Sequence, residues 1–184
     1  IPDRSSDKAF AARMDRLASR YETVKRFQSI TTVSRADTAL KVLTMYHDDE
    51  DLIYTVFAVD FDAGSLSPVL RNGFEALGLS LDTSPDHYSD YYAVINGGQI
   101  TAQEQTAADW NDPLTYDGKE EGLRIHLQGG SGDQEEMTLN GTDCTSDQSG
   151  LRIAVYSKSE HRLLDCITLS YDGTAVTHGK EAGN

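Results

Sequence analysis

The chain has 184 residues, of which 38% are hydrophobic and 25% are charged, and its formal net charge is −14. These values are typical of a globular domain that is large enough to bury a core. No apolar run approaches the roughly 20 residues that a membrane-spanning helix needs. We therefore expect contact with a membrane only through an anchor outside this sequence.

The charge is unevenly distributed along the chain. The first 35 residues hold eight of the 16 basic residues and only four acids, so this part carries +4 and the rest carries −18. An acidic surface repels phosphate groups, which argues against a nucleic-acid partner for the globular part.

Residues 7–28 are predicted to form an amphipathic helix, because apolar side chains recur there at alternating spacings of four and three. We interpret this basic helix as a stalk or docking helix; a self-associating coil and a segment near an anionic membrane surface are the alternatives. A shorter helix is predicted at 37–46. The predicted divisions are a helical arm (1–35), an α+β domain (36–175) and a flexible tail (176–184). The apolar seam of the arm consists of Phe10, Met14, Leu17, Tyr21 and Val24.

Residues 52–59 form a nearly continuous apolar run of β-branched and aromatic side chains, which is typical of a strand covered on both faces. The run ends in an acidic turn at residues 60–65. Beyond the turn, apolar residues recur at helical spacing until a glycine, with Ser65 or Ser67 as the N-cap and Pro68 in the first turn. The sequence therefore predicts a strand, an acidic turn and a helix in succession.

The remainder of the chain is dominated by strand signals. Residues 91–95 and 99–104 predict a β-hairpin around an Asn-Gly-Gly turn. Residues 105–120, which contain the single tryptophan Trp110, are predicted to be a loop, and residues 172–184 a frayed polar end. The further predicted strands are 123–127, 136–139, 151–156 and 163–169. The expected fold class is α+β and mainly β.

The two cysteines, Cys144 and Cys166, are too few for a disulfide-rich scaffold. Each falls in a predicted strand or strand edge, so the two could be neighbours in a sheet. A disulfide is expected if the protein is extracytoplasmic, and two buried thiols otherwise. The sequence leaves both outcomes open.

The sequence contains no motif typical of a phosphate loop, a zinc site or a nucleophile elbow, and we predict no cofactor, no metal and no catalytic residue. The acidic run at 47–51 lacks the spacing of a calcium loop and is interpreted as a solvated turn. His126 is expected to face solvent from its strand. The alternative is Asp60-Phe61-Asp62, because paired carboxylates at a strand end can hold Mg²⁺ or Mn²⁺ in a glycan enzyme.

Two parts of the chain resemble the interleukin-like EMT inducer family (ILEI/PANDER-like). The first comprises Val-Asp-Phe-Asp-Ala-Gly-Ser-Leu at 59–66, Phe-Glu-Ala-Leu-Gly-Leu at 74–79 and Ser-Asp-Tyr-Tyr-Ala-Val-Ile-Asn-Gly-Gly at 89–98. The second pairs Gly-Leu-Arg-Ile-Ala-Val-Tyr at 150–156 with Leu-Leu-Asp-Cys-Ile-Thr-Leu-Ser-Tyr-Asp at 163–172. Together they cover about half of the chain. The second hairpin comes last rather than first, an order similar to circularly permuted bacterial relatives. The resemblance implies an antiparallel, sandwich-like β domain with flanking helices.

The resemblance also implies a function, which is non-catalytic carbohydrate binding in an extracytoplasmic accessory domain of a surface-glycan system. The sugar-contacting acid of a family member matches Asp62, its aromatic residue falls near Tyr92, and a polar position falls near Asp90. Tyr92 stands where that member has tryptophan, and Ser89 stands where an arginine is expected. A carboxylate beside an aromatic face is suited to holding a sugar ring.

The predicted ligand-binding set is Asp60, Asp62, Gly64, Ser65, Asp90, Tyr91, Tyr92 and Trp110. The expected partner is a glycan or surface polysaccharide. One alternative function is a protein–protein interaction module that binds a partner, or a second copy, through residues 7–28. The other is a metal-dependent glycan enzyme that uses Asp60 and Asp62.

Overall fold

The structure is a computed structural model that describes residues 44, 47, 49–84, 87–130, 134–145, 149–173 and 175–178. The predicted arm with its 7–28 helix lies outside the described residues. Of the predicted helix at 37–46, only Thr44 is described, and it is helical.

The described residues form ten strands, one α-helix and one short 3-10 helix. In chain order these are β1 (Leu52–Phe61), η1 (Ala63–Ser65), α3 (Pro68–Ala76), β2 (Ser89–Asn96), β3 (Gln99–Ala107), β4 (Thr115–Glu120), β5 (Leu123–Gln128), β6 (Glu136–Leu139), β7 (Thr142–Asp143), β8 (Leu151–Ser157), β9 (Arg162–Leu169) and β10 (Val176–His178).

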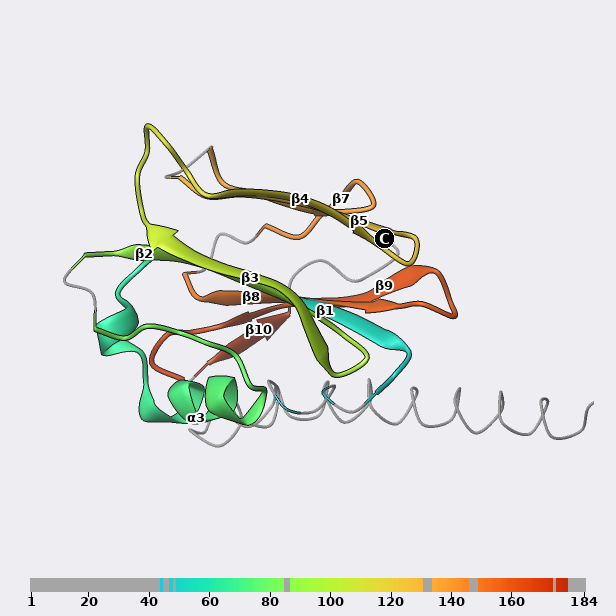
Figure 1. Cartoon of the computed structure of the whole chain (residues 1–184), viewed down its shortest axis with the longest axis horizontal. Helices are drawn as coiled ribbons and strands as arrows, with labels where there is room; N and C mark the ends of the chain where they lie inside the picture. The colour runs from blue at the N-terminus through green and yellow to red at the C-terminus, as the bar shows by residue number, and fades with distance from the viewer. Residues whose placement is uncertain are drawn as a thin grey trace, which may run out of the picture.

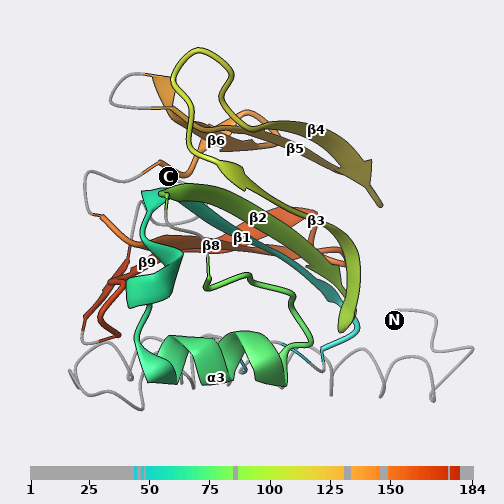
Figure 2. The same ribbon diagram turned by 60° about the vertical axis from the view of Figure 1, so that its left-hand side comes forward.

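The strands form two antiparallel sheets. Sheet A has the order β10-β9-β8-β1-β2-β3, and sheet B has the order β4-β5-β6-β7. In Figure 1, α3 lies along one face of sheet A and sheet B lies across the other face, and the turned view in Figure 2 shows the same three layers. One hydrophobic core lies between α3 and sheet A, and a second lies between the two sheets. The predicted α+β, mainly antiparallel and sandwich-like fold is confirmed.

Strand β1 is central in sheet A, and both of its faces are buried. Tyr54, Val56 and Ala58 belong to the core beneath α3, whereas the alternate residues Ile53 and Phe57 belong to the core beneath sheet B. The period of two side chains in a strand explains this division. It also explains the continuous apolar run in the sequence, because residues 52–58 of β1 are buried on both faces of the sheet.

Helix α3 begins where the capping signals placed it. Ser67, one of the two predicted caps, accepts a hydrogen bond from the backbone N–H of Leu70 at 3.2 Å, and Pro68 occupies the first turn. Leu70 and Phe74 face the core. The helix ends before Gly78, whose φ of +74° is accessible to glycine with little strain.

Two strands differ from the prediction, and both lie at sheet edges. Residues 115–120 were predicted to be loop but form β4, which pairs with β5 alone and alternates between exposed and partly exposed residues. Residues 176–178 were assigned to a flexible tail but form β10, which pairs with β9. An edge strand with few buried side chains has no apolar period, so hydrophobic patterning does not detect it.

A disulfide joins Cys144, just after β7 in sheet B, to Cys166 in β9 of sheet A, with the Cα atoms 5.8 Å apart. The cysteines therefore lie on facing sheets rather than next to each other in one sheet. The bridge spans 22 residues, and a loop of that length corresponds to roughly 3 kcal/mol of stabilisation in the chain-entropy account. Separately, none of the helices that the structure describes is long and apolar enough to cross a membrane.

Candidate functional site

The two ends of the sandwich differ in their chemistry. At one end β1 leads through a bulge into the acidic turn, near the start of β2 and the end of β3; we call this the bulge end. At the opposite end, which we call the turn end, the β2–β3, β4–β5 and β8–β9 turns lie close to the start of β1. Most of the predicted site residues lie at the bulge end.

The bulge is centred on Asp60. The register of β1 against β2 shifts between Ala58 and Phe61, and Asp60 adopts a left-handed φ of +49°. Its backbone N–H turns toward the neighbouring strand and donates to Asp90 Oδ1 at 2.8 Å. Asp tolerates this conformation better than most residues, and bulges commonly redirect side chains near functional sites.

The acidic turn that follows is held by its own side chains. Asp62 Oδ1 accepts from the Gly64 N–H at 3.1 Å, and Oδ2 accepts from the Ser65 hydroxyl at 2.6 Å. Arg71 of α3 donates to the backbone carbonyls of Gly64 and Leu66. Asp62 therefore caps η1 from an exposed position.

Behind the bulge lies a cluster of charged groups, formed by the buried Asp90 and Arg152 and the partly exposed Glu135. Asp90 is only 1% exposed and Arg152 only 6%. Arg152 Nη1 lies 2.7 Å from Glu135 Oε1, a close ion pair. Gly129 packs so tightly over Asp90 that an added Cβ would lie 2.4 Å from Oδ2. Glu135 therefore has Arg152 as its ion-pair partner and a second acid, Asp90, close enough to affect its charge.

The surroundings of the two acids change their pKa values. Burial raises the pKa of Asp90, although the backbone amides of Asp60 and Leu114 oppose the increase. Burial also raises the pKa of Glu135, against the attraction of Arg152 and with a further contribution from Asp90. A like charge nearby and a low-dielectric environment both disfavour the second ionised carboxylate.

The two tyrosines predicted to contact a ligand are core residues instead. Tyr91 is fully buried and packs edge-on against Phe74 of α3, with ring centroids 5.6 Å apart. Tyr92 points between the sheets and stacks on Tyr116 at 4.5 Å, and burial raises its pKa to about 12. Both rings are buried because β2 is covered on both faces, so an aromatic surface for a ligand would have to come from other side chains.

Two exposed aromatic residues lie in the segments that flank the β2–β3 hairpin, Tyr88 just before β2 and Trp110 after β3. Tyr88 is 57% exposed and Trp110 is 64% exposed, and these are the two exposed large hydrophobic side chains among the described residues. The Tyr88 carbonyl accepts from the Ala108 N–H at 2.9 Å, which places Tyr88 next to the end of β3. Trp110 follows Ala108 by two residues. The sequence prediction included Trp110 but missed Tyr88, whose position just outside a strand in a polar segment was the available signal.

A polar pocket of about 240 Å³ lies at the same end of the β2–β3 hairpin. Hydrogen bonds from Ser84 lower the pKa of Asp82, so this carboxylate is charged at neutral pH. Gln105 Nε2 donates to the Ser89 hydroxyl at 3.2 Å across the pocket wall. The pocket is lined by Asp82, His87, Ser89, Gln105, Thr106 and Ala107.

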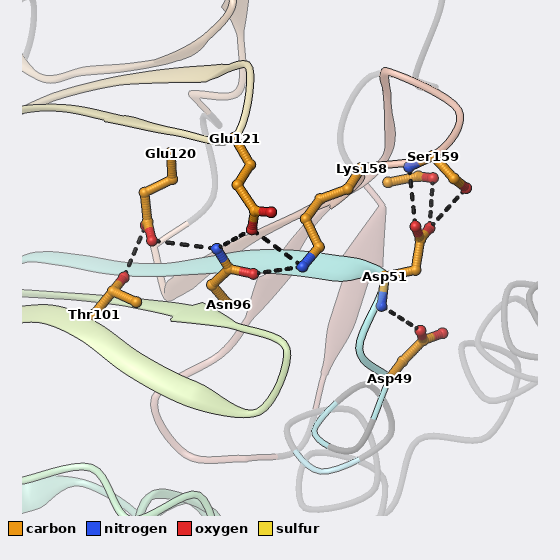
Figure 3. A network of polar contacts seen from close by, with 9 residues as sticks. Asp49, Asp51, Asn96, Thr101, Glu120, Glu121, Lys158 and Ser159 are labelled. Atoms are coloured by element: carbon orange, nitrogen blue, oxygen red, sulfur yellow. Dashed lines mark hydrogen bonds and ion pairs between the residues drawn. The ribbon is translucent and has the colours of Figure 1, made fainter.

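The turn end, in contrast, is held by a connected polar network (Figure 3). Lys158 donates to Asn96 at 2.8 Å and to Glu121 at 3.2 Å, which ties the β8–β9 turn to both sheets. The buried carboxylate of Asp51 accepts from Ser157 and Ser159. These contacts pair the charged groups of the network with partners of suitable geometry.

His126 lies on the outer face of sheet B, which agrees with the predicted solvent-facing position. Its Nδ1 lies 2.6 Å from Asp117 and its Nε2 lies 2.8 Å from Glu136. The hydrogen bond to Asp117 is the main reason that the pKa of His126 is raised. Within the described part of the chain, no three His, Cys, Asp or Glu side chains are grouped so as to hold a metal ion.

Comparison with protein-family models, curated proteins and solved structures found no match. The family resemblance, the interaction through residues 7–28 and the glycan-enzyme alternative therefore stay predictions. The structure places Asp60, Asp62, Gly64 and Ser65 on the surface of the bulge end, buries Asp90, Tyr91 and Tyr92, and exposes Trp110.

Proposed function

We propose that this protein is a non-catalytic carbohydrate-binding domain and that the sugar binds at the bulge end. The observation that supports this most directly is that two exposed aromatic residues belong to the chain segments that line a polar pocket. Tyr88 lies between the lining residues His87 and Ser89, and Trp110 follows the lining residue Ala107 by three positions. A sugar ring presents an apolar face and a rim of hydroxyl groups, so it needs an aromatic surface next to hydrogen-bonding groups. A pocket edged by Asp82, Ser89 and Gln105 supplies the latter.

The acidic turn contributes to the same surface. Gly64 lies against the backbone of Thr83, where an added Cβ would be 3.2 Å from the carbonyl oxygen, and the preceding residue Asp82 lines the pocket. The turn contains Asp62, which matches the sugar-contacting acid of an ILEI-like family member. This turn thus adjoins the pocket. In this proposal Tyr88 and Trp110 take the role that the sequence assigned to Tyr91 and Tyr92.

The disulfide supports an extracytoplasmic location, because disulfides persist in oxidising compartments and are rare in a reducing cytosol. An accessory role in a surface-glycan system fits that location. We therefore propose that the domain recognises glycan at the cell surface or in the secreted environment.

The test is a glycan array probed with the wild-type chain, Trp110→Ala and Tyr88→Ala. Loss of an aromatic ring that stacks on a sugar should weaken binding about tenfold. Lys119→Ala, an exposed change on sheet B, is the matched control and should bind like the wild type. Thermal melting establishes that each variant is folded. Binding that survives in both aromatic variants, or a folded wild type that binds no glycan, would contradict the proposal.

A further inference from the structure

An extended segment, residues 79–84, separates the polar pocket from a second hollow; we call it the strap. Two glutamines of β3 hold its backbone. Gln103 Oε1 accepts from the Ser80 N–H at 3.0 Å, and Gln105 pairs with Asp82 through both backbone groups, at 2.8 Å and 2.9 Å. Side-chain amides take the place of a neighbouring strand here. The strap is thereby held in one conformation before any ligand arrives.

The second hollow is a groove of about 400 Å³ between the strap and α3. Thr83 of the strap lines the groove, and the adjacent residue Asp82 lines the polar pocket. Consecutive Cα atoms are only about 3.8 Å apart, so the two hollows lie on either side of one extended segment of backbone, the strap. The groove is lined by Arg71, Phe74, Glu75, Leu79, Leu81 and Thr83.

The two hollows differ in size. Small-molecule sites generally occupy roughly 300–1,000 Å³. The polar pocket, at about 240 Å³, is below that range, whereas the groove, at about 400 Å³, is within it. A ligand that extends across the strap would therefore be better enclosed than a ligand confined to the pocket.

The charges of the groove indicate which ligand it suits. Arg71 is oriented because Nε donates to the Leu66 carbonyl at 3.0 Å and a terminal nitrogen donates to the Gly64 carbonyl. A guanidinium has five donors, so it retains others for a ligand hydroxyl. Glu75, one turn along α3, supplies an acceptor and balances the charge. Leu79 and Leu81 add an apolar surface. The acidic body of the protein repels an anionic polymer.

We propose that the groove and the polar pocket are two subsites for one neutral oligosaccharide, which crosses the strap between Asp82 and Thr83. This inference rests on the proposed function and adds to it that the ligand is a chain of uncharged sugars rather than a single sugar. The groove takes one end of the chain through Arg71 and Glu75, and the pocket with Tyr88 and Trp110 takes the other.

The test uses an array of neutral glucose, mannose, galactose and N-acetylglucosamine oligomers, each printed at one, two and four units. The tetramer of the recognised sugar should bind about tenfold more tightly than its monomer, the gain of one further good hydrogen-bonding contact. Glu75→Ala and Arg71→Ala should remove this gain, so that the tetramer binds no more tightly than the monomer. Asn72→Ala, an exposed change on α3 outside the groove lining, is the matched control.

Glu75→Ala keeps the proposal testable if Arg71→Ala disturbs the acidic turn, because Arg71 also bonds that turn. Equal binding of monomer and tetramer, with no effect of Glu75→Ala, would overturn the second subsite and leave the proposed function intact. Absence of binding to every neutral sugar would instead overturn the proposed function. Preference for anionic glycans added to the same array would contradict the assigned sugar class.

Discussion

The two ends of the sandwich use charge in opposite ways. At the turn end, Lys158 lies between Asn96 and Glu121, and Asp51 accepts several hydrogen bonds. At the bulge end, Arg152 pairs with the partly exposed Glu135, and the buried Asp90 lies near Glu135; the pKa values of both acids are raised. Buried groups with such perturbed pKa values are often found near functional sites, because burial that serves stability alone pairs its charges. The pocket and the exposed aromatic side chains lie at this less favourable end.

The sharpest way to separate the two ends is to remove the arginine of the charged cluster behind the bulge. Arg152→Met keeps much of the side-chain volume but leaves Glu135 without its ion-pair partner next to the buried Asp90, so the unfolding free energy should fall by about 3–5 kcal/mol. Urea denaturation at neutral pH measures the change. Arg124→Met, exposed on sheet B, should stay within about 0.5 kcal/mol of the wild type. A loss under about 1 kcal/mol for Arg152→Met would mean that the acids are already neutral.

The equivalent change at the turn end should cost less. Lys158 is 21% exposed and its contacts are partly open to water, so Lys158→Met should lower the unfolding free energy by about 1 kcal/mol. The same denaturation series measures it, and added salt should reduce the difference from the wild type because exposed charges are screened. A loss as large as that of Arg152→Met would remove the distinction between the ends.

The smallest expected effect is a pH dependence that originates at the bulge end. Asp90 and Glu135 bind protons more readily when folded than when unfolded, since both pKa values are raised. Their unfavourable contribution at neutral pH should therefore diminish as pH falls toward their folded-state pKa values, and stability should rise. Asp90→Asn retains an oxygen for the Asp60 N–H but cannot titrate, so it should rise less over the same interval. Melting temperatures from neutral pH to pH 5 measure this, and parallel curves for the two proteins would refute it.

The fold could largely be predicted because its central elements carry strong local signals. The apolar run of β1, the serine cap and proline of α3, and the Asn-Gly-Gly turn of the β2–β3 hairpin each determine local structure directly. Strand β4 could not be recognised, because Thr115–Glu120 packs few side chains and relies on β5 for its hydrogen bonds. Edge strands depend on a neighbour that local periodicity does not reveal.

The site was harder to predict, because it depends on which face of a residue is covered. Tyr91 and Tyr92 alternate in β2, so one should face solvent if the sheet has a free face; here α3 covers one side and sheet B the other. Asp90 in β2 and Arg152 in β8 are 62 positions apart in the chain. No local sequence pattern predicts that they belong to one cluster. The exposure of Trp110 was predictable from its position in a loop, where an aromatic side chain has few neighbours to cover it.

The disulfide has a practical consequence for making the protein. Sheet B consists of one continuous stretch, β4 to β7, inserted between β3 and β8, and Cys144 at its end is bonded to Cys166 in the other sheet. In a reducing expression host this stretch would be attached only by its connecting loops and its packing. Its amide hydrogens should then exchange with solvent faster than those of β1 and β2, while the central strands keep their protection. Expression into an oxidising compartment should yield protein with the disulfide formed and sheet B attached through it, which is the form to use for binding measurements.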